Sequence, residues 1–170
     1  PNGNILVIVW ENKTADEAYA VGRQSIDNSL NVMWSEAILE LEPVGINDVN
    51  IVWEWHLWDH LIQDVDPDLP NYGVISDHPE LQDINYGNAG SNGGPGGANG
   101  DWKHFNAVAY NEDLDQIALS SRFHDEIYII DHSTTTEEAA GHTGGNSGMG
   151  GDFLYRWGNP HSYNRGSDLD

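Results

Sequence analysis

The residues of most chemical interest lie at one end of a predicted β-hairpin. Two short runs with high strand propensity, HFNAVAY at 104–110 and QIALSSR at 116–122, flank a polar turn stretch. If the turn is centred on Asp113, antiparallel pairing sets residue 104 opposite 122 and residue 106 opposite 120. Strand alternation then places on one face the side chains of His104, Asn106, Ser120 and Arg122. The other face takes Phe105, Ala107, Ile117 and Leu119.

Three of these polar side chains can donate hydrogen bonds to an anion. Arg122 offers a planar fork of N–H groups, which a lysine cannot provide. Asn106 adds a neutral amide donor, and His104 adds a donor or a proton, depending on its tautomer. The spacing therefore predicts a site that holds an oxyanion. From these residues alone, the alternative is a solvated polar edge of the hairpin.

Composition limits the partners of such a site. The 170 residues suffice for one domain with a hydrophobic core. A net charge of −22, from 28 acidic residues against six basic ones, excludes nucleic acid and anionic membrane surfaces as partners. This charge is typical of a strongly hydrated surface, with a salty environment or bound cations as the alternatives. There is no cysteine, hence no disulfide or thiolate chemistry, and no apolar run is long enough to span a membrane.

Short strands separated by irregular loops dominate the predicted secondary structure. The expected strands cover residues 4–10, 32–43, 50–60, 104–110, 116–122, 126–131 and 153–157. One short helix is expected within 14–23, because Thr14 can act as its N-cap with Glu17 three positions later. A long connection, 61–101, ends in a tract in which seven of the fourteen residues 87–100 are glycine.

A faint internal repeat links the two halves of the chain. Trp53-Glu54-Trp55 ends one set of strands as Tyr155-Arg156-Trp157 ends the other, and Ser35-Glu36 opens a strand as Asp125-Glu126 does. Repeated four-stranded units of this kind predict an all-β fold, a β-propeller fragment built of four-stranded antiparallel blades. A β-sandwich would use similar strands, but it does not account for the repeated aromatic ends.

This interpretation divides the chain into four parts. Residues 1–60 form the last three strands of a partial blade, 61–101 a long glycine-rich connection between blades, 102–157 a complete blade, and 158–170 the start of the connection to the next blade. The chain would then be a piece of a longer protein. A piece with under two blades has open sheet edges and uncovered apolar faces, so we expect it to be unstable or self-associating by itself.

The chain resembles bacterial arylsulfate sulfotransferases over nearly its whole length. The resemblance is carried by PNGNILVIVWENKTADEAYAVGR, IVWEWHLWDHLIQD, DWKHFNAVAYNEDLDQIALSSR, EIYIIDHSTTTEEAAGHTGG and GGDFLYRWGNP. It implies a propeller enzyme that moves a sulfuryl group between phenols without a nucleotide cofactor. It also implies that His104, Asn106 and Arg122 hold the sulfuryl group. The nucleophile of the family is a histidine that becomes sulfated, expected in a later blade, and another active-site histidine is expected just upstream of Pro1.

Blade topology ranks the remaining candidates. The end of the sheet that carries His104 is also expected to carry Lys103, Arg156 and three further histidines, His56, His60 and His124. The additional candidates for substrate binding are His56, His60, Trp102 and His124. For His56 and His60 the favoured alternative is packing or capping of the sheet end. Trp102 or Trp58 would supply an aromatic slot for the phenol ring, unless both belong to the core. His132 and His142 are expected at the opposite rim, and His78 and His161 in solvent.

The predicted function is that of an aryl-sulfate sulfotransferase acting through a sulfated histidine supplied by a missing blade, and the resemblance implies a periplasmic or secreted parent protein. The alternative is a non-catalytic propeller module that binds anionic or carbohydrate ligands; a lyase or hydrolase with the same donors is a third possibility. No cofactor and no metal ligand set are expected. Asp64, Asp66 and Asp68 have the spacing of a calcium loop, but Leu69 and Ile75 replace the glycine and glutamate that an EF-hand needs.

Overall fold

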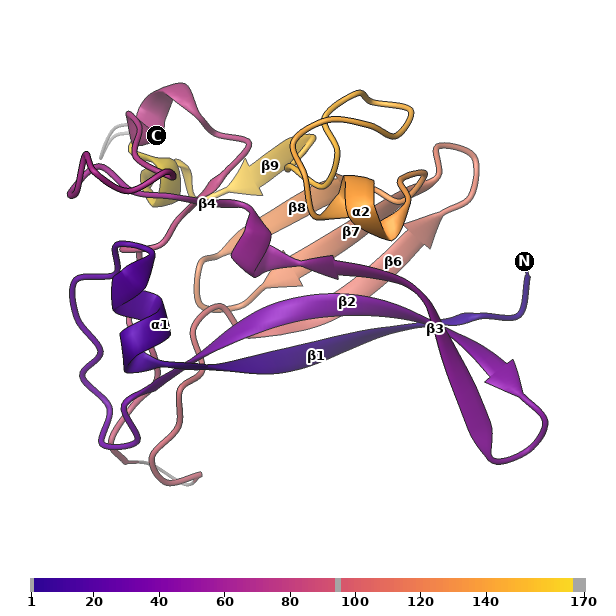
Figure 1. Ribbon diagram of the computed structural model, residues 1–170, viewed down its shortest axis with the longest axis horizontal. Helices are drawn as coiled ribbons and strands as arrows, with labels where there is room; N and C mark the ends of the chain where they lie inside the picture. Colours follow the sequence, from indigo (N-terminus) through magenta and orange to yellow (C-terminus); the bar gives the residue numbers. More distant parts are fainter. Residues whose placement is uncertain (1, 94–95, 167–170) are drawn as a thin grey trace.

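The computed structural model describes residues 2–93 and 96–166 and contains two antiparallel sheets (Figure 1). The first has the order β1-β2-β3, with β1 at Ile5–Thr14, β2 at Val32–Val44 and β3 at Asp48–His56. The β2–β3 hairpin extends away from the rest of the molecule (Figure 1). All three strands were predicted, although β1 continues four residues beyond the predicted end at 10 and β3 ends four residues before 60.

The predicted helix is confirmed as α1, Ala15–Ala20, which follows β1 directly. Its N-terminus is a capping box: the Glu17 N–H donates to Thr14 Oγ1 at 3.2 Å, and the Thr14 N–H donates to the Glu17 carboxylate at 2.8 Å. The box satisfies two N–H groups that have no partner within the helix. The same threonine therefore ends β1 and starts α1.

The second sheet has four consecutive antiparallel strands. They are β6 at Phe105–Asn111, β7 at Gln116–Ser121, β8 at Glu126–Asp131 and β9 at Tyr155–Gly158. The all-β class is thus confirmed, and the four strands lie close to their predicted positions. The β8–β9 loop contains the one-turn helix α2, Thr136–Ala139, and β9 is followed by a 3-10 turn, Pro160–Tyr163.

The connection between the sheets has short elements of its own. A 3-10 turn at Leu57–Asp59 leads into β4, Leu61–Ile62, which pairs in parallel with β5, Gln82–Asp83; a second 3-10 turn covers Ile75–Asp77. The described part of the glycine tract folds back on itself, because the Gly90 N–H donates to the Asp101 carbonyl at 2.7 Å. A Cβ at Gly90 would lie 1.8 Å from the Asn99 carbonyl oxygen, so this close approach requires glycine.

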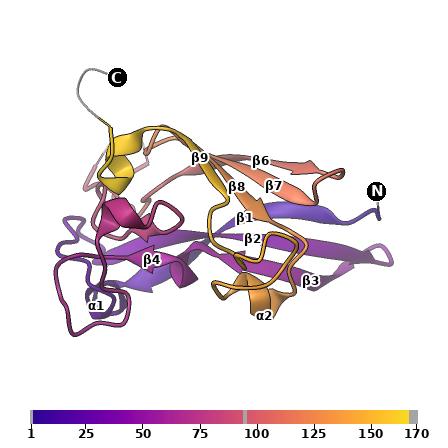
Figure 2. The same ribbon diagram turned by 90° about the horizontal axis from the view of Figure 1, so that it is seen from above.

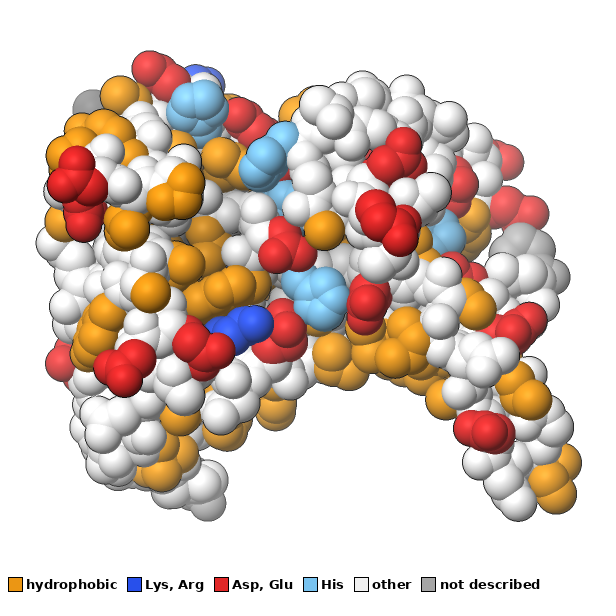
Figure 3. Space-filling view, viewed as in Figure 1, with side chains coloured by type: hydrophobic (Ala, Val, Ile, Leu, Met, Phe, Trp, Pro, Cys, Tyr) orange, Lys and Arg blue, Asp and Glu red, His pale blue; other side chains and the backbone are white. Residues whose placement is uncertain are grey.

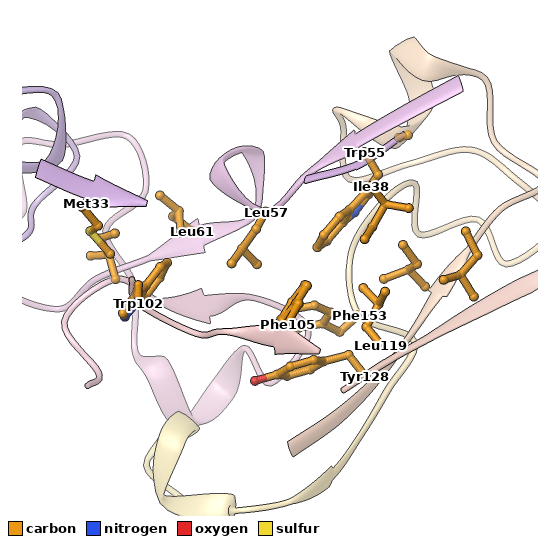
Figure 4. Close-up of a cluster of buried hydrophobic side chains, with 14 of the residues drawn as sticks. Met33, Ile38, Trp55, Leu57, Leu61, Trp102, Phe105, Leu119, Tyr128 and Phe153 are labelled. Carbon is orange, nitrogen blue, oxygen red and sulfur yellow. The ribbon is translucent and has the colours of Figure 1, made fainter. Parts of the chain in front are cut away.

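The core lies between the two sheets, which face each other in Figure 2. Figure 4 shows part of this core, whose labelled members come from both sheets and from the connection: Met33, Ile38, Trp55, Leu57, Leu61, Trp102, Phe105, Leu119, Tyr128 and Phe153. The rings of Tyr128 and Phe153 stack with centroids 4.4 Å apart. This shared core fixes the position of β6 and β7 against β1 and β2.

The surface reflects the composition. Acidic side chains are spread over the face seen in Figure 3, where lysine and arginine atoms are few. Among the described residues, no helix has the length and apolar character needed to cross a membrane.

Candidate functional site: the rim of the β6–β7 hairpin

His104 stands directly before β6 and is paired with a carboxylate. Its Nδ1 lies 2.5 Å from Asp101 Oδ2, and its side chain is 30% exposed. A carboxylate only accepts, so Nδ1 carries the hydrogen and Nε2 has the lone pair when the ring is neutral. Nε2 forms no hydrogen bond with any described residue, which leaves it available to a ligand. The backbone of His104 has φ of +54°, an uncommon conformation for a residue with a side chain.

Asn106 lies in a β-bulge, which corrects the predicted register. Phe105 pairs with Ser121 and Ala107 with Ser120, so Asn106 is the extra residue and does not stand opposite 120. A bulge interrupts the alternation of faces, and Ala107 is exposed instead of sharing the buried face of Phe105. The Asn106 side chain is exposed and forms no hydrogen bond with any described residue.

Arg122 follows β7 and is held beside His104 by the backbone. The Arg122 N–H donates to the His104 carbonyl at 3.1 Å, which confirms that 104 stands opposite 122. The guanidinium is exposed, lies 5.5 Å from the centroid of the Phe123 ring, and forms no ion pair within the described residues. An arginine without a carboxylate partner is notable in a chain of charge −22.

The other two cations predicted for this rim are buried instead. Lys103 is fully buried, donating to Tyr128 Oη at 2.7 Å and to Gln82 Oε1. Arg156 forms a buried ion pair with Glu126 at 2.7 Å. Burial lowers the pKa of Lys103 well below its usual value. Lys103 and Arg156 therefore lie at the predicted end of the sheet, but they do not face a ligand as Arg122 does, because their partners lie inside the core.

Aromatic side chains flank the His104 ring. The centroid of Phe123 lies 5.0 Å away and that of Trp10 lies 6.2 Å away, and both side chains are about half exposed. Sequence reasoning had assigned this slot to Trp102 or Trp58. Trp102 is fully buried and donates to the Tyr86 carbonyl at 2.8 Å. Trp10 was missed because its β1 run reads as a uniformly buried strand, whereas one edge of β1 is unpaired.

A buried carboxyl, Glu36 on β2, was also missed. It is fully buried, and neither oxygen forms a hydrogen bond of good geometry, although the backbone N–H groups of His104 and Phe105 face it. Burial raises its pKa to about 7, opposed by nearby Lys103. The available signal was a glutamate within a predicted strand, next to the apolar residues 37–39.

The three other candidate histidines occupy different environments. His56 pairs with Glu11 at 3.1 Å, and this hydrogen bond raises the pKa of His56. His60 is fully buried with both ring nitrogens bonded, so no atom of it is open to a substrate. His124 is fully buried with neither ring nitrogen bonded, and burial lowers its pKa well below the usual value.

The histidines expected away from the site are bonded elsewhere. His132 bridges Glu40 at 3.0 Å and Asp115 at 2.8 Å, beside the turn at the opposite end of the hairpin. His142 pairs with Asp152 at 2.8 Å, and His78, which was expected to be solvated, pairs with Glu80 while remaining half exposed.

Comparison with known proteins supports the resemblance noted in the sequence. The family model described as arylsulfotransferase (ASST) matches residues 1–138, which include all of β1 to β8 and therefore the complete hairpin rim. No curated protein and no solved structure matched the chain. The chain belongs to the arylsulfotransferase family.

Proposed function

We propose that this chain forms the oxyanion-holding part of an aryl-sulfate sulfotransferase. One observation carries the proposal: in this member of the family, an exposed Arg122 without an ion-pair partner lies beside His104, whose ring is paired with the Asp101 carboxylate. Asn106, exposed in the bulge two residues after His104, adds a neutral donor. In this proposal the chain is part of a β-propeller in a periplasmic or secreted protein, and the remaining blades supply the histidine that becomes sulfated.

The proposed reaction has two transfer steps. The histidine from a further blade attacks the sulfur of the aryl sulfate, the S–O bond to the phenol breaks, and the leaving phenolate takes a proton from Nε2 of His104. A second phenol then attacks the sulfur of the sulfated histidine, the N–S bond breaks, and the proton of this phenol passes to Nε2 of His104, which restores both histidines. The sulfuryl oxygens carry negative charge throughout, and the transition state of each step places charge on the phenol oxygen.

The rim residues match those charges. Arg122 provides two parallel N–H donors for two sulfuryl oxygens. Asn106 donates to a sulfuryl oxygen without adding charge, and the protonated His104 ring delivers a proton from Nε2 to the leaving phenol. Preorganised donors of this kind typically contribute about 2.7–4 kcal/mol each to transition-state stabilisation. Trp10 and Phe123, beside the His104 ring, provide faces on which a phenol can stack.

Asp101 acts on the reaction through His104. With Nδ1–H bonded to the carboxylate, the ring keeps one tautomer and one orientation, with Nε2 on the ligand side. The buried Oδ1 of Asp101 has no hydrogen-bond partner among the described residues. Asp101 is therefore a positioning residue in this proposal.

The experiment measures transfer from a chromogenic aryl sulfate to a phenol by the complete protein. We expect ping-pong kinetics, and a roughly tenfold to hundredfold lower turnover for Asn106→Ala. The matched control is Asn50→Ala, which removes an exposed amide from β3, outside the candidate site, and should leave turnover unchanged.

Three outcomes separate the alternatives. Saturable binding of the aryl sulfate without turnover would identify a non-catalytic anion-binding module. Release of free sulfate that does not depend on the phenol would identify a hydrolase. Equal transfer by Asn106→Ala and wild type would remove Asn106 from the site.

A further inference from the structure

A second histidine–carboxylate group lies outside the hairpin rim. His60 follows the 3-10 turn after β3, and His142 and Asp152 come from the loop between α2 and β9. Their ligand atoms, one from each residue, all lie within 4.8 Å of one another. This group could not be predicted from the sequence, because His142 lies 82 positions after His60 and neither belongs to a metal-binding motif.

Both ring nitrogens of His60 face oxygen atoms that accept hydrogen bonds, and a neutral ring has only one N–H to donate. Its Nε2 lies 2.8 Å from the Ala139 carbonyl oxygen, which only accepts, so Nε2 carries a hydrogen. Its Nδ1 lies 2.8 Å from Asp152 Oδ1. In a neutral imidazole this Nδ1 has a lone pair facing the lone pairs of a carboxylate, inside a fully buried site. A positive charge is required between the two atoms, supplied either by a second proton or by a metal ion.

His142 points a second nitrogen at the same oxygen. Its Nδ1 also lies 2.8 Å from Asp152 Oδ1, while its side chain is 58% exposed. Two imidazole nitrogens and one carboxylate oxygen thus converge on one point, with one side open to solvent. This is the donor set that Zn²⁺ takes in sites with three protein ligands, and nitrogen donors disfavour Ca²⁺ and Mg²⁺.

The contacts around the His60 ring are those typical of a histidine that binds a metal ion. A histidine ligand usually donates its second N–H to a carbonyl or carboxylate, as His60 does to Ala139. Trp55 stacks on the ring with centroids 5.6 Å apart and an interplanar angle of 7°. The Trp55 indole N–H donates to the Gly151 carbonyl at 2.7 Å, and a Cβ at Gly151 would lie 2.7 Å from His60 Nε2. The loop is therefore packed against the ring by a glycine that no larger residue can replace.

We propose that His60, His142 and Asp152 bind one Zn²⁺, which ties the α2–β9 loop to the end of β3. The ligands are His60 Nδ1, His142 Nδ1 and a carboxylate oxygen of Asp152, with the fourth position open beside His142. Bonds of about 2.0–2.2 Å place tetrahedral ligands about 3.3 Å apart, so each 2.8 Å pair widens by about half an ångström on binding. A cavity of about 380 Å³, lined by His142, Trp58, Asp59 and His78 among others, gives the ion a path from solvent.

The first experiment titrates the complete, chelator-treated protein with Zn²⁺ alone. We expect wild type to bind one equivalent more than His142→Gln, measured by calorimetry and by metal analysis after gel filtration. For that site the variant should lose at least a factor of 10–100 in affinity. His142→Gln changes an exposed side chain, so the fold should persist, which circular dichroism checks. The matched control His161→Gln removes an exposed histidine elsewhere and should bind like wild type.

The second experiment does not depend on a variant. Bound Zn²⁺ should protect His142 in wild type from modification by diethyl pyrocarbonate, while Ca²⁺ should not. Equal Zn²⁺ stoichiometry and affinity in wild type and His142→Gln would overturn the proposal, as would the absence of protection.

Discussion

In the three-stranded sheet the aromatic side chains at the end of β3, Trp53 and Trp55, are 4% and 0% exposed. The corresponding Tyr155 and Trp157 of β9, in the four-stranded sheet, are 59% and 65% exposed. The sequences WEW and YRW are alike. The face of the three-stranded sheet that carries Trp53 and Trp55 is covered by the four-stranded sheet, whereas no described residues cover the face that carries Tyr155 and Trp157. The exposed aromatic side chains of β9 are the surface that a further blade would cover in the proposed propeller.

Two buried glutamates, Glu36 within β2 and Glu126 at the start of β8, also differ in their surroundings. Glu126 is paired with Arg156 at 2.7 Å and accepts from Ser162 and Tyr128. Glu36 is equally buried but has no arginine partner: Arg156 stands opposite Tyr128, two residues after Glu126, whereas Trp55 stands opposite Ile38, two residues after Glu36. Glu126 therefore forms a buried ion pair, and Glu36 is a carboxyl whose pKa burial raises to about 7 beside the candidate site.

The largest effect is expected for the matched pair Trp55→Ala and Trp157→Ala. Trp55→Ala should lower the free energy of unfolding by about 3–5 kcal/mol, because the core loses a fully buried indole. In the complete protein Trp157→Ala should cost about 2–4 kcal/mol, since a further blade would cover this side chain. Denaturant unfolding measures both. A loss below about 0.5 kcal/mol for Trp157→Ala would show a true surface residue and contradict the propeller.

The Glu126–Arg156 pair gives the next effect. Arg156→Ala should lower the free energy of unfolding by about 3–5 kcal/mol, because it leaves a carboxylate buried without its ion-pair partner. The control is Arg165→Ala, which removes an exposed arginine and should stay within about 0.5 kcal/mol. If the two variants were equally stable, the buried ion pair would contribute nothing to the fold.

Glu36 gives a smaller effect that depends on pH. Its folded-state pKa of about 7 is raised above the usual 4.5, so folding favours the protonated carboxyl. The stability that this group contributes is complete below about pH 4.5 and is lost as the pH rises through about 7. Glu36→Gln should therefore match wild type near pH 4.5 and exceed it at pH 8, by roughly 1–3 kcal/mol. Thermal unfolding at both pH values measures the difference, and parallel curves for the two proteins would contradict the buried-carboxyl interpretation.

The sequence predicted the fold well where one local pattern decided the outcome. The capping box of Thr14 and Glu17 sets the start of α1 by hydrogen bonds three residues apart. The β6–β7 hairpin follows from two strand-prone runs and a polar turn, and 104 does stand opposite 122. The domain division of the chain stays a prediction.

The candidate site was harder to predict because its environment is set by distant residues. The bulge at Asn106 is one extra residue in β6 relative to β7, and the alternation of polar and apolar residues within one strand does not reveal such an insertion. Lys103 looks like a surface cation until Gln82 and Tyr128 are known to lie around it inside the core. Trp10 reaches His104 only because the two sheets meet along β1 and β6.

The central claim is that Arg122 holds the sulfuryl group through its planar fork, and Arg122→Lys tests it most directly. This variant keeps the charge and, because the side chain is exposed and unpaired, should keep the fold. In the complete protein we expect transfer from a chromogenic aryl sulfate to a phenol to fall about tenfold to hundredfold. Arg122→Ala should fall further, by about 10²–10³, with Asn106→Ala between wild type and Arg122→Ala.

Circular dichroism confirms the fold of each variant, and Arg165→Lys controls for loss of an exposed guanidinium elsewhere. Near-normal transfer by a well-folded Arg122→Lys protein would contradict the account, because a lysine cannot reproduce the paired donors.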